Sequence, residues 1–132
     1  MQESKLLHNL KIDLKDLQSG EFALESLDRK MERCEDVTFV ESRKVRPSMT
    51  DGVGHVNNTK YADYIYDAMT LEERKKLSYL CAMDIWFNYE LREGDVFSIY
   101  KFSLDDTTLC FSGIKDGENR SSFDLRLKFD LE

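Results

Sequence analysis

The clearest pattern in the chain is an alternation of apolar and polar residues near its C-terminal end. Over residues 123–131 the apolar positions are Phe123, Leu125, Leu127, Phe129 and Leu131, with mostly charged residues between them. A period of two indicates a strand with one buried face. Weaker alternation over 83–90, 96–104 and 108–114 predicts three more strands, separated by turn residues. Because the connections are of hairpin length, the sheet should be antiparallel.

Two short helices are predicted before these strands. The apolar positions with helical spacing are Tyr61, Tyr64, Ile65 and Ala68. Asn57 and Asn58 are favourable N-caps, so this helix should start there and reach about Met69. The segment Thr70-Leu-Glu-Glu73 is a capping box, which predicts a second helix beginning at Leu71.

The first 35 residues are less regular than the rest of the chain. Four leucines fit a helix, yet residues 10–14 also alternate as a strand would, and Ser19-Gly20 interrupts the segment. We interpret residues 1–35 as a helical or irregular connector. Residues 36–132 form one domain of the α+β class, which opens with a strand over 37–45 that Pro47 limits.

Composition excludes several classes of protein. With 132 residues, 41% of them hydrophobic, the chain is long enough for one core, and no apolar run approaches the roughly 18 residues of a membrane span. The net charge of -7 argues against a nucleic-acid partner. Three widely spaced cysteines without metal-ligand spacing are typical of reduced thiols in a cytoplasmic protein, and two histidines are too few for a histidine-rich metal site. We expect no metal and no cofactor.

The candidate chemistry lies in one loop, directly before the first predicted helix. The run Asp51-Gly-Val-Gly-His-Val-Asn-Asn58 places a carboxylate and an imidazole beside a helix N-terminus, whose N–H groups and dipole can polarise a carbonyl. Gly52 and Gly54 indicate a tight backbone path. Two other interpretations stay open, because an Asp before Gly often caps a turn and a single histidine is often structural.

This run, followed by Lys60-Tyr61, resembles the signature of the acyl-acyl-carrier-protein (acyl-ACP) thioesterases. A second segment, Phe87-Asn-Tyr-Glu90 with Gly94-Asp95, resembles the strand of that family that carries a functional glutamate. The resemblance covers roughly residues 37–131 and implies a hotdog fold, in which an antiparallel sheet wraps around a central helix. The family pattern is Asp-x-Asn-x-His, and this chain departs from it by having Val53 at the middle position.

The resemblance implies hydrolysis of fatty acyl thioesters to a free fatty acid and the carrier thiol. The carrier is ACP or, as an alternative, coenzyme A. The implied catalytic residues are Asp51, His55 and Glu90. The residues implied to form the oxyanion site or to position the substrate are Gly54, Asn57 and Asn58.

Two alternatives remain open. The valine at 53 suits a non-catalytic acyl-binding or dimerisation module, and a hotdog dehydratase would use a carboxylate and a histidine contributed across a dimer. Members of the family usually join two hotdog domains by a connector, and this chain resembles the connector and the second domain. We therefore expect a homodimer or pairing with a second hotdog domain. An acidic carrier protein would need a basic surface, for which residues 43–46 and 74–76 are candidates.

Overall fold

The structure is a computed structural model that describes residues 37–52 and 54–130. The predicted connector over residues 1–35 lies outside the described residues. The strands are β1 (Thr38–Lys44), β2 (Leu80–Phe87), β3 (Val96–Asp105), β4 (Thr108–Lys115) and β5 (Ser121–Phe129). They form one sheet in the order β1-β3-β4-β5-β2, and every neighbouring pair is antiparallel. The predicted α+β class and antiparallel sheet are confirmed.

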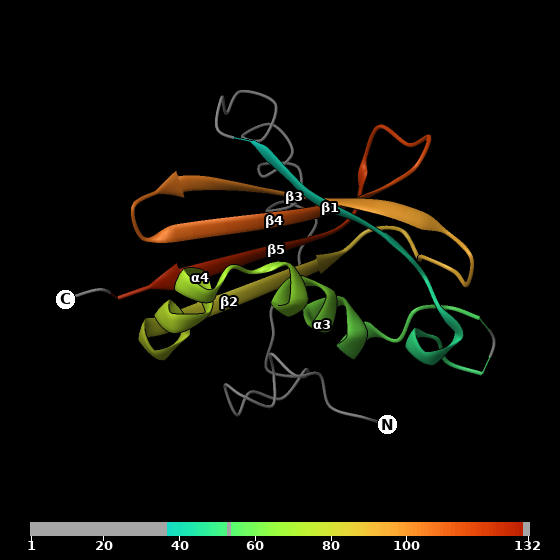
Figure 1. Cartoon of the computed structure of the whole chain (residues 1–132), viewed down its shortest axis with the longest axis horizontal. Helices are drawn as coiled ribbons and strands as arrows, with labels where there is room; N and C mark the ends of the chain where they lie inside the picture. The colour runs from blue at the N-terminus through green and yellow to red at the C-terminus, as the bar shows by residue number, and fades with distance from the viewer. Residues whose placement is uncertain (1–36, 53, 131–132) are drawn as a thin grey trace.

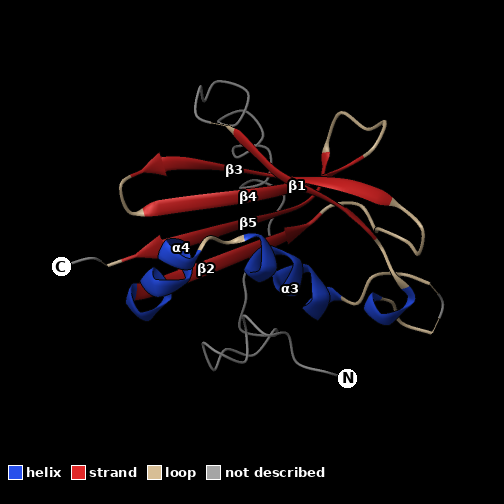
Figure 2. Ribbon diagram, in the orientation of Figure 1, coloured by secondary structure: helices blue, strands red, loops and turns tan. Residues whose placement is uncertain are grey.

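The helices lie on one side of this sheet (Figures 1 and 2). The longer helix is α3 (Asn58–Ala68), and the shorter is α4 (Leu71–Lys75). Both begin where the sequence predicts. Asn57 caps α3, and Thr70 and Glu73 form the predicted capping box of α4. Two 3-10 turns, η2 (Pro47–Met49) and η3 (Lys76–Tyr79), were not predicted.

The main core lies between α3 and the sheet. The helix contributes all four residues of its predicted apolar face, and the strands contribute the apolar residues that alternate along them. In β5 the buried residues of this face are Phe123, Leu125, Leu127 and Phe129, as the period of two predicts. The alternation therefore turns one face of the sheet toward the helix.

A smaller cluster lies on the opposite face of the sheet. Trp86, Phe102 and Cys110 are all at most 3% exposed and belong to β2, β3 and β4. Next to them Arg126 lies over the Trp86 ring and bonds the Asp84 carboxylate, with 3.0 Å between Nε and Oδ2. Part of the polar face that alternation predicts is thus buried and ion-paired.

Gly113 of β4 is the point of closest packing in the sheet. It lies opposite Phe123, and a Cβ atom at Gly113 would come within 2.1 Å of that ring. The ring is fully buried and packs against the rings of Tyr61 and Phe97, with centroids 4.8 and 6.0 Å away. A side chain at position 113 would therefore force this packed ring to shift, so the position favours glycine.

We expect Gly113→Ala to lower the free energy of unfolding by about 1–3 kcal/mol, the usual cost of overpacking a core. Chemical denaturation measures this change. The matched control is Gly52→Ala, because a Cβ atom there meets no atom within 4 Å. Equal stability of the Gly113→Ala chain and the parent would contradict the packing described above.

Candidate functional site

The loop before α3 is held by bonds within itself. The N–H of Asp51 donates to the carbonyl of His55 at 2.8 Å, and the N–H of His55 donates back to Oδ1 of Asp51 at 3.1 Å. Gly54 has φ +87°, a left-handed conformation that favours glycine, and its N–H donates to the carbonyl of Asp51 at 3.3 Å. Asp51 therefore caps a turn, as one of the open interpretations predicted. This geometry does not test a catalytic role for Asp51.

Asn57 joins the loop to the helix. Its side-chain oxygen accepts the N–H of Thr59 at 3.1 Å and the Thr59 hydroxyl at 2.9 Å. Its own N–H donates to the carbonyl of Met49 at 3.0 Å, which ties the loop to the preceding 3-10 turn. Asn57 is the predicted N-cap, and Asn58 is the first residue of α3. Any positioning role of Asn57 therefore acts through the shape of the loop.

The connection between β2 and β3 runs alongside this loop. Its Arg92 forms an isolated antiparallel bridge with His55. The bonds on either side join Val56 N–H to the Leu91 carbonyl and Glu93 N–H to the Gly54 carbonyl, both at 2.8 Å. Segments that lie some 35 residues apart in the sequence are thereby held side by side.

This pairing brings two of the three predicted catalytic residues together. Oε2 of Glu90 lies 3.3 Å from Nδ1 of His55. The imidazole is about one-third exposed and the carboxylate about two-thirds exposed, so both are accessible from solvent. Since Nδ1 faces Glu90, the second ring nitrogen, Nε2, lies on the far side of the ring from that carboxylate.

Two sets of contacts that the sequence analysis missed hold Glu90 in place. The N–H groups of Asn88 and Tyr89 both donate to the Ser122 carbonyl, at 2.8 and 3.1 Å, and Nδ2 of Asn88 donates to the fully buried Asp124 at 3.1 Å. β2 therefore ends at Phe87, rather than continuing to Glu90 as its alternation predicted. The short strand and the bend at Tyr89 carry Glu90 toward the motif loop.

The second anchor comes from α3. The hydroxyl of the buried Tyr61 accepts the N–H of Leu91 at 3.2 Å. Burial, assisted by the nearby Glu90 carboxylate, raises the pKa of Tyr61, and burial raises the pKa of Tyr64 to about 12. Both phenols are therefore neutral near pH 7, so neither is a candidate general base. No signal within one segment of sequence indicates that Tyr61 reaches Leu91.

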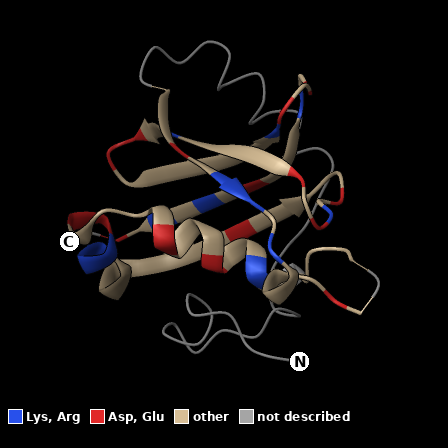
Figure 3. Cartoon of the chain, turned by 45° about the vertical axis from the view of Figure 1, so that its right-hand side comes forward, with Lys and Arg blue, Asp and Glu red and all other residues tan. Residues whose placement is uncertain are grey.

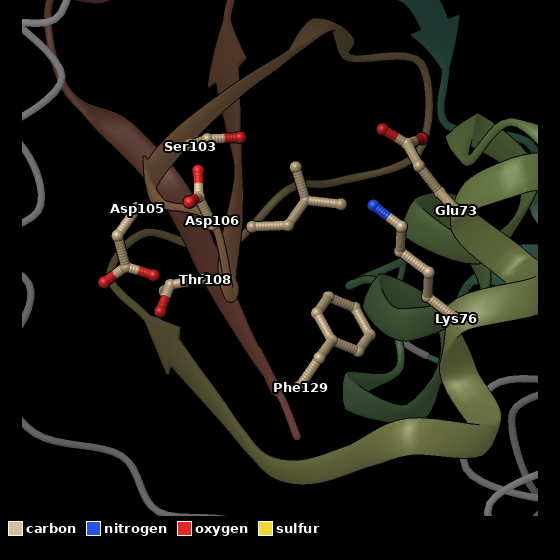
Figure 4. A pocket seen from close by; sticks show the side chains of 8 residues that line it. Glu73, Lys76, Ser103, Asp105, Asp106, Thr108 and Phe129 are labelled. Carbon is tan, nitrogen blue, oxygen red and sulfur yellow. The ribbon is translucent and has the colours of Figure 1, made fainter. Parts of the chain in front are cut away.

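A pocket of about 100 Å³ lies at the other end of the sheet (Figure 4). Its lining consists of Glu73, Lys76, Ser103, Asp105, Asp106, Thr108, Leu109 and Phe129. Phe129 pairs with Leu80 at the start of β2, whereas the candidate site adjoins the end of β2 at Phe87. In Figure 4 Glu73 and Lys76 face the acidic turn of β3–β4 across an apolar floor. This pocket is therefore separate from the candidate site, and its lining contains no imidazole or thiol.

The arrangement at the motif loop suits attack on a carbonyl. The imidazole of His55, paired with the Glu90 carboxylate, can transfer protons. A second carboxylate, that of Asp51, lies in the same turn as His55. Within residues 37–52 and 54–130, no group of three potential metal-ligating side chains is found. None of the helices in this part of the chain is long and apolar enough to cross a membrane.

Solved structures with a similar architecture include two thioesterases and a protein in complex with CoA. An acyl-ACP thioesterase from Bacteroides thetaiotaomicron superposes with a TM-score of 0.62 at 19% identity, over 70% of this chain and 37% of that one. A Staphylococcus aureus protein in complex with CoA superposes with a TM-score of 0.56 at 17% identity, over 68% of this chain and 67% of that one. A 1,4-dihydroxy-2-naphthoyl-CoA thioesterase from Synechocystis superposes with a TM-score of 0.51 at 15% identity, over 67% of this chain and 77% of that one. The fold is therefore the hotdog fold of thioesterases.

The family follows from the sequence match. The model of the acyl-ACP thioesterase C-terminal domain matches residues 32–130, and the chain belongs to this family. No curated protein matches the chain significantly. The predicted fold and family resemblance are both confirmed. The roles of the predicted site residues stay predictions.

Proposed function

We propose that the protein hydrolyses fatty acyl thioesters to a free fatty acid and the carrier thiol. The observation that carries the proposal is the approach of Glu90, in the β2–β3 connection, to within 3.3 Å of His55 in the loop that bears the family motif. The family and the fold support the same reaction class. Solvent access to both side chains suits a reaction that consumes water.

The proposed reaction uses the residues of the loop in order. Asp51 accepts a proton from the attacking water as the water oxygen bonds to the carbonyl carbon. His55, oriented by Glu90, donates a proton to the sulfur as the C–S bond breaks, and a proton then passes from Asp51 to His55, which restores both side chains. The products are a carboxylic acid and a thiol, so atoms and charge balance. A positioned acid or base contributes roughly 10²–10⁴-fold to such a reaction.

The experiment that tests this function is turnover by the full chain. Decanoyl-CoA and decanoyl-ACP are the substrates, and release of free thiol is the readout. Thiol release above the uncatalysed rate is the expected result. Binding of both substrates without thiol release would favour the non-catalytic module, and hydration of an enoyl thioester would favour the dehydratase.

The carrier is the finer part of the proposal. Lysine and arginine are interspersed with aspartate and glutamate over the described chain (Figure 3). In the first candidate basic segment, the Arg43 guanidinium lies 3.6 Å from Glu41 and 3.8 Å from Asp67. Lys44 and Arg46 remain exposed there. We keep ACP as the first carrier to test and CoA as the second.

We expect the chain to self-associate as a twofold dimer or to pair with a second hotdog domain. Among residues 37–52 and 54–130, β1 and β2 each have one neighbour in the sheet, so in this part of the chain both present an open edge. Exposed aromatic residues lie on or beside these edges: Phe39, Tyr79, Phe87 and Tyr89. Sedimentation at roughly tens of micromolar should show a dimer. A monomer under those conditions would contradict self-association.

Restoring the family residue with Val53→Asn should raise turnover by about tenfold, which corresponds to roughly 1.4 kcal/mol of barrier. An asparagine side chain hydrogen-bonds a carboxylate or water, whereas valine offers no polar atom. The measurement compares the kcat of the two chains on the same thioester. Absence of turnover by both chains would remove the support for an enzyme and favour the binding module.

A further inference from the structure

In the described part of the motif loop and first helical turn, most backbone N–H groups already have an acceptor in the protein. Seven N–H groups between residues 51 and 60 already donate to acceptors in the protein, namely those of Asp51, Gly54, His55, Val56, Asn57, Thr59 and Lys60. An oxyanion needs donors that are available and preorganised. A side-chain donor beside the loop would meet this need, and valine at position 53 supplies none.

Arg92 stands directly opposite His55. The two residues form a bridge whose hydrogen bonds are made by the residues on either side, Val56 with Leu91 and Gly54 with Glu93. In a pair of this kind the Cα atoms lie about 4.5 Å apart, and the side chains project from the same face. The Arg92 side chain therefore leaves the backbone beside the imidazole of His55.

The backbone of Arg92 is fixed, and its guanidinium is available. Its N–H donates to Oδ2 of Asp95 at 2.8 Å, and its carbonyl accepts the N–H of Asp95 at 3.0 Å. The side chain is exposed, and in the part of the chain that the structure describes no carboxylate oxygen lies within 4 Å of its guanidinium nitrogens. By contrast, Arg43 and Arg126 are both held by carboxylates.

We propose that Arg92 binds the oxygen atoms of the acyl group: the carbonyl oxygen of the thioester as it becomes negative, and the carboxylate of the product. A guanidinium stays protonated at all working pH values and presents five donors in a plane, which matches a carboxylate. Arg92 forms no covalent bond and gives up no proton. This inference rests on the proposed hydrolysis for its kinetic part.

The kinetic test compares Arg92→Gln and Arg92→Lys with the parent on decanoyl-CoA and decanoyl-ACP. We expect Arg92→Gln to lower kcat by about 10²–10³-fold, the usual loss of an oxyanion donor, and to change KM little. Lysine keeps the charge without the planar donors, so the kcat of Arg92→Lys should lie between that of Arg92→Gln and that of the parent. A thermal unfolding curve of each variant checks that the substitution leaves the fold intact.

The matched control is Arg120→Gln. Arg120 is exposed at the same end of the sheet, and its guanidinium lies 4.1 Å from the ring centre of Tyr89, the neighbour of Glu90. This substitution removes the same charge without touching the bridge to His55, so kcat should stay near that of the parent. Equal losses of kcat in Arg92→Gln and Arg120→Gln would overturn the proposal, as would a rise of KM alone in Arg92→Gln.

A binding test separates this inference from the proposed function. Decanoate should bind Arg92→Gln about tenfold more weakly than the parent, because one charge-assisted interaction is lost, whereas decanol should bind both alike. Equal decanoate affinity overturns the inference even where the parent hydrolyses thioesters. A parent that shows the Arg92-dependent decanoate binding but no turnover overturns the hydrolysis and supports the acyl-oxygen site.

Discussion

Replacing Asp51 by asparagine should lower turnover of acyl thioesters by about 10²-fold or more, because it removes the proposed base. Asparagine is close in size to aspartate and retains a side-chain oxygen. That oxygen can still accept the N–H of His55, a bond of 3.1 Å in the parent. The substitution therefore separates the chemistry of the carboxylate from its role in the turn. The measurement is kcat with each thioester, together with a thermal unfolding curve.

Two other outcomes of this experiment are informative. Equal activity of the Asp51→Asn chain and the parent would remove Asp51 from the mechanism. Loss of the cooperative unfolding transition would show that the charge of Asp51 is needed to hold the turn, and that its main role is structural rather than catalytic. That result would match the usual structural role of an aspartate that precedes a glycine.

Local periodicity predicted α3 and β5 because each of them buries a regular row of apolar side chains. The apolar positions of α3 and β5 follow periods of 3.6 and 2, and both sets are buried against each other. The capping box at Thr70 has a local cause as well, since its bonds join residues three apart. Strand order is a different matter: β2 lies beside β5 rather than β3, and this pairing joins segments distant in sequence.

The end of β2 could not be predicted from alternation. Residues 83–90 alternate throughout, yet Asn88 and Tyr89 both bond to the carbonyl of Ser122, and the chain bends there. Those bonds depend on where β5 lies, which only the tertiary structure determines. The same long-range packing places Glu90 beside His55.

The sequence therefore predicted which residues belong to the candidate site, but it did not predict how they are arranged in space. The family resemblance points to Asp51, His55 and Glu90 without their mutual positions. Arg92 was missed because a single arginine before a Glu-Gly-Asp turn resembles ordinary surface charge. Its pairing with His55 arises from hydrogen bonds between two loops, and each loop alone is polar and irregular.

Glu90→Gln should lower kcat by about 10²-fold while leaving stability within about 1 kcal/mol of the parent. An exposed ion pair contributes little to folding. In the proposed reaction the same carboxylate, 3.3 Å from Nδ1, orients the imidazole for proton transfer. Glutamine keeps the size and one acceptor oxygen, so the loss reports the charge. The control is Glu118→Gln, an exposed glutamate outside the site, which should have the activity of the parent.

The decisive comparison is a double-mutant cycle between Glu90 and His55. If the carboxylate acts only through the imidazole, its removal costs nothing further once the imidazole is gone. The His55→Gln, Glu90→Gln double variant should then turn over at the rate of His55→Gln alone. Losses that multiply, to about 10⁴-fold in the double variant, would show instead that the two residues act independently. Glu90 would then contact the water or the substrate itself, and its approach to His55 would have no catalytic role.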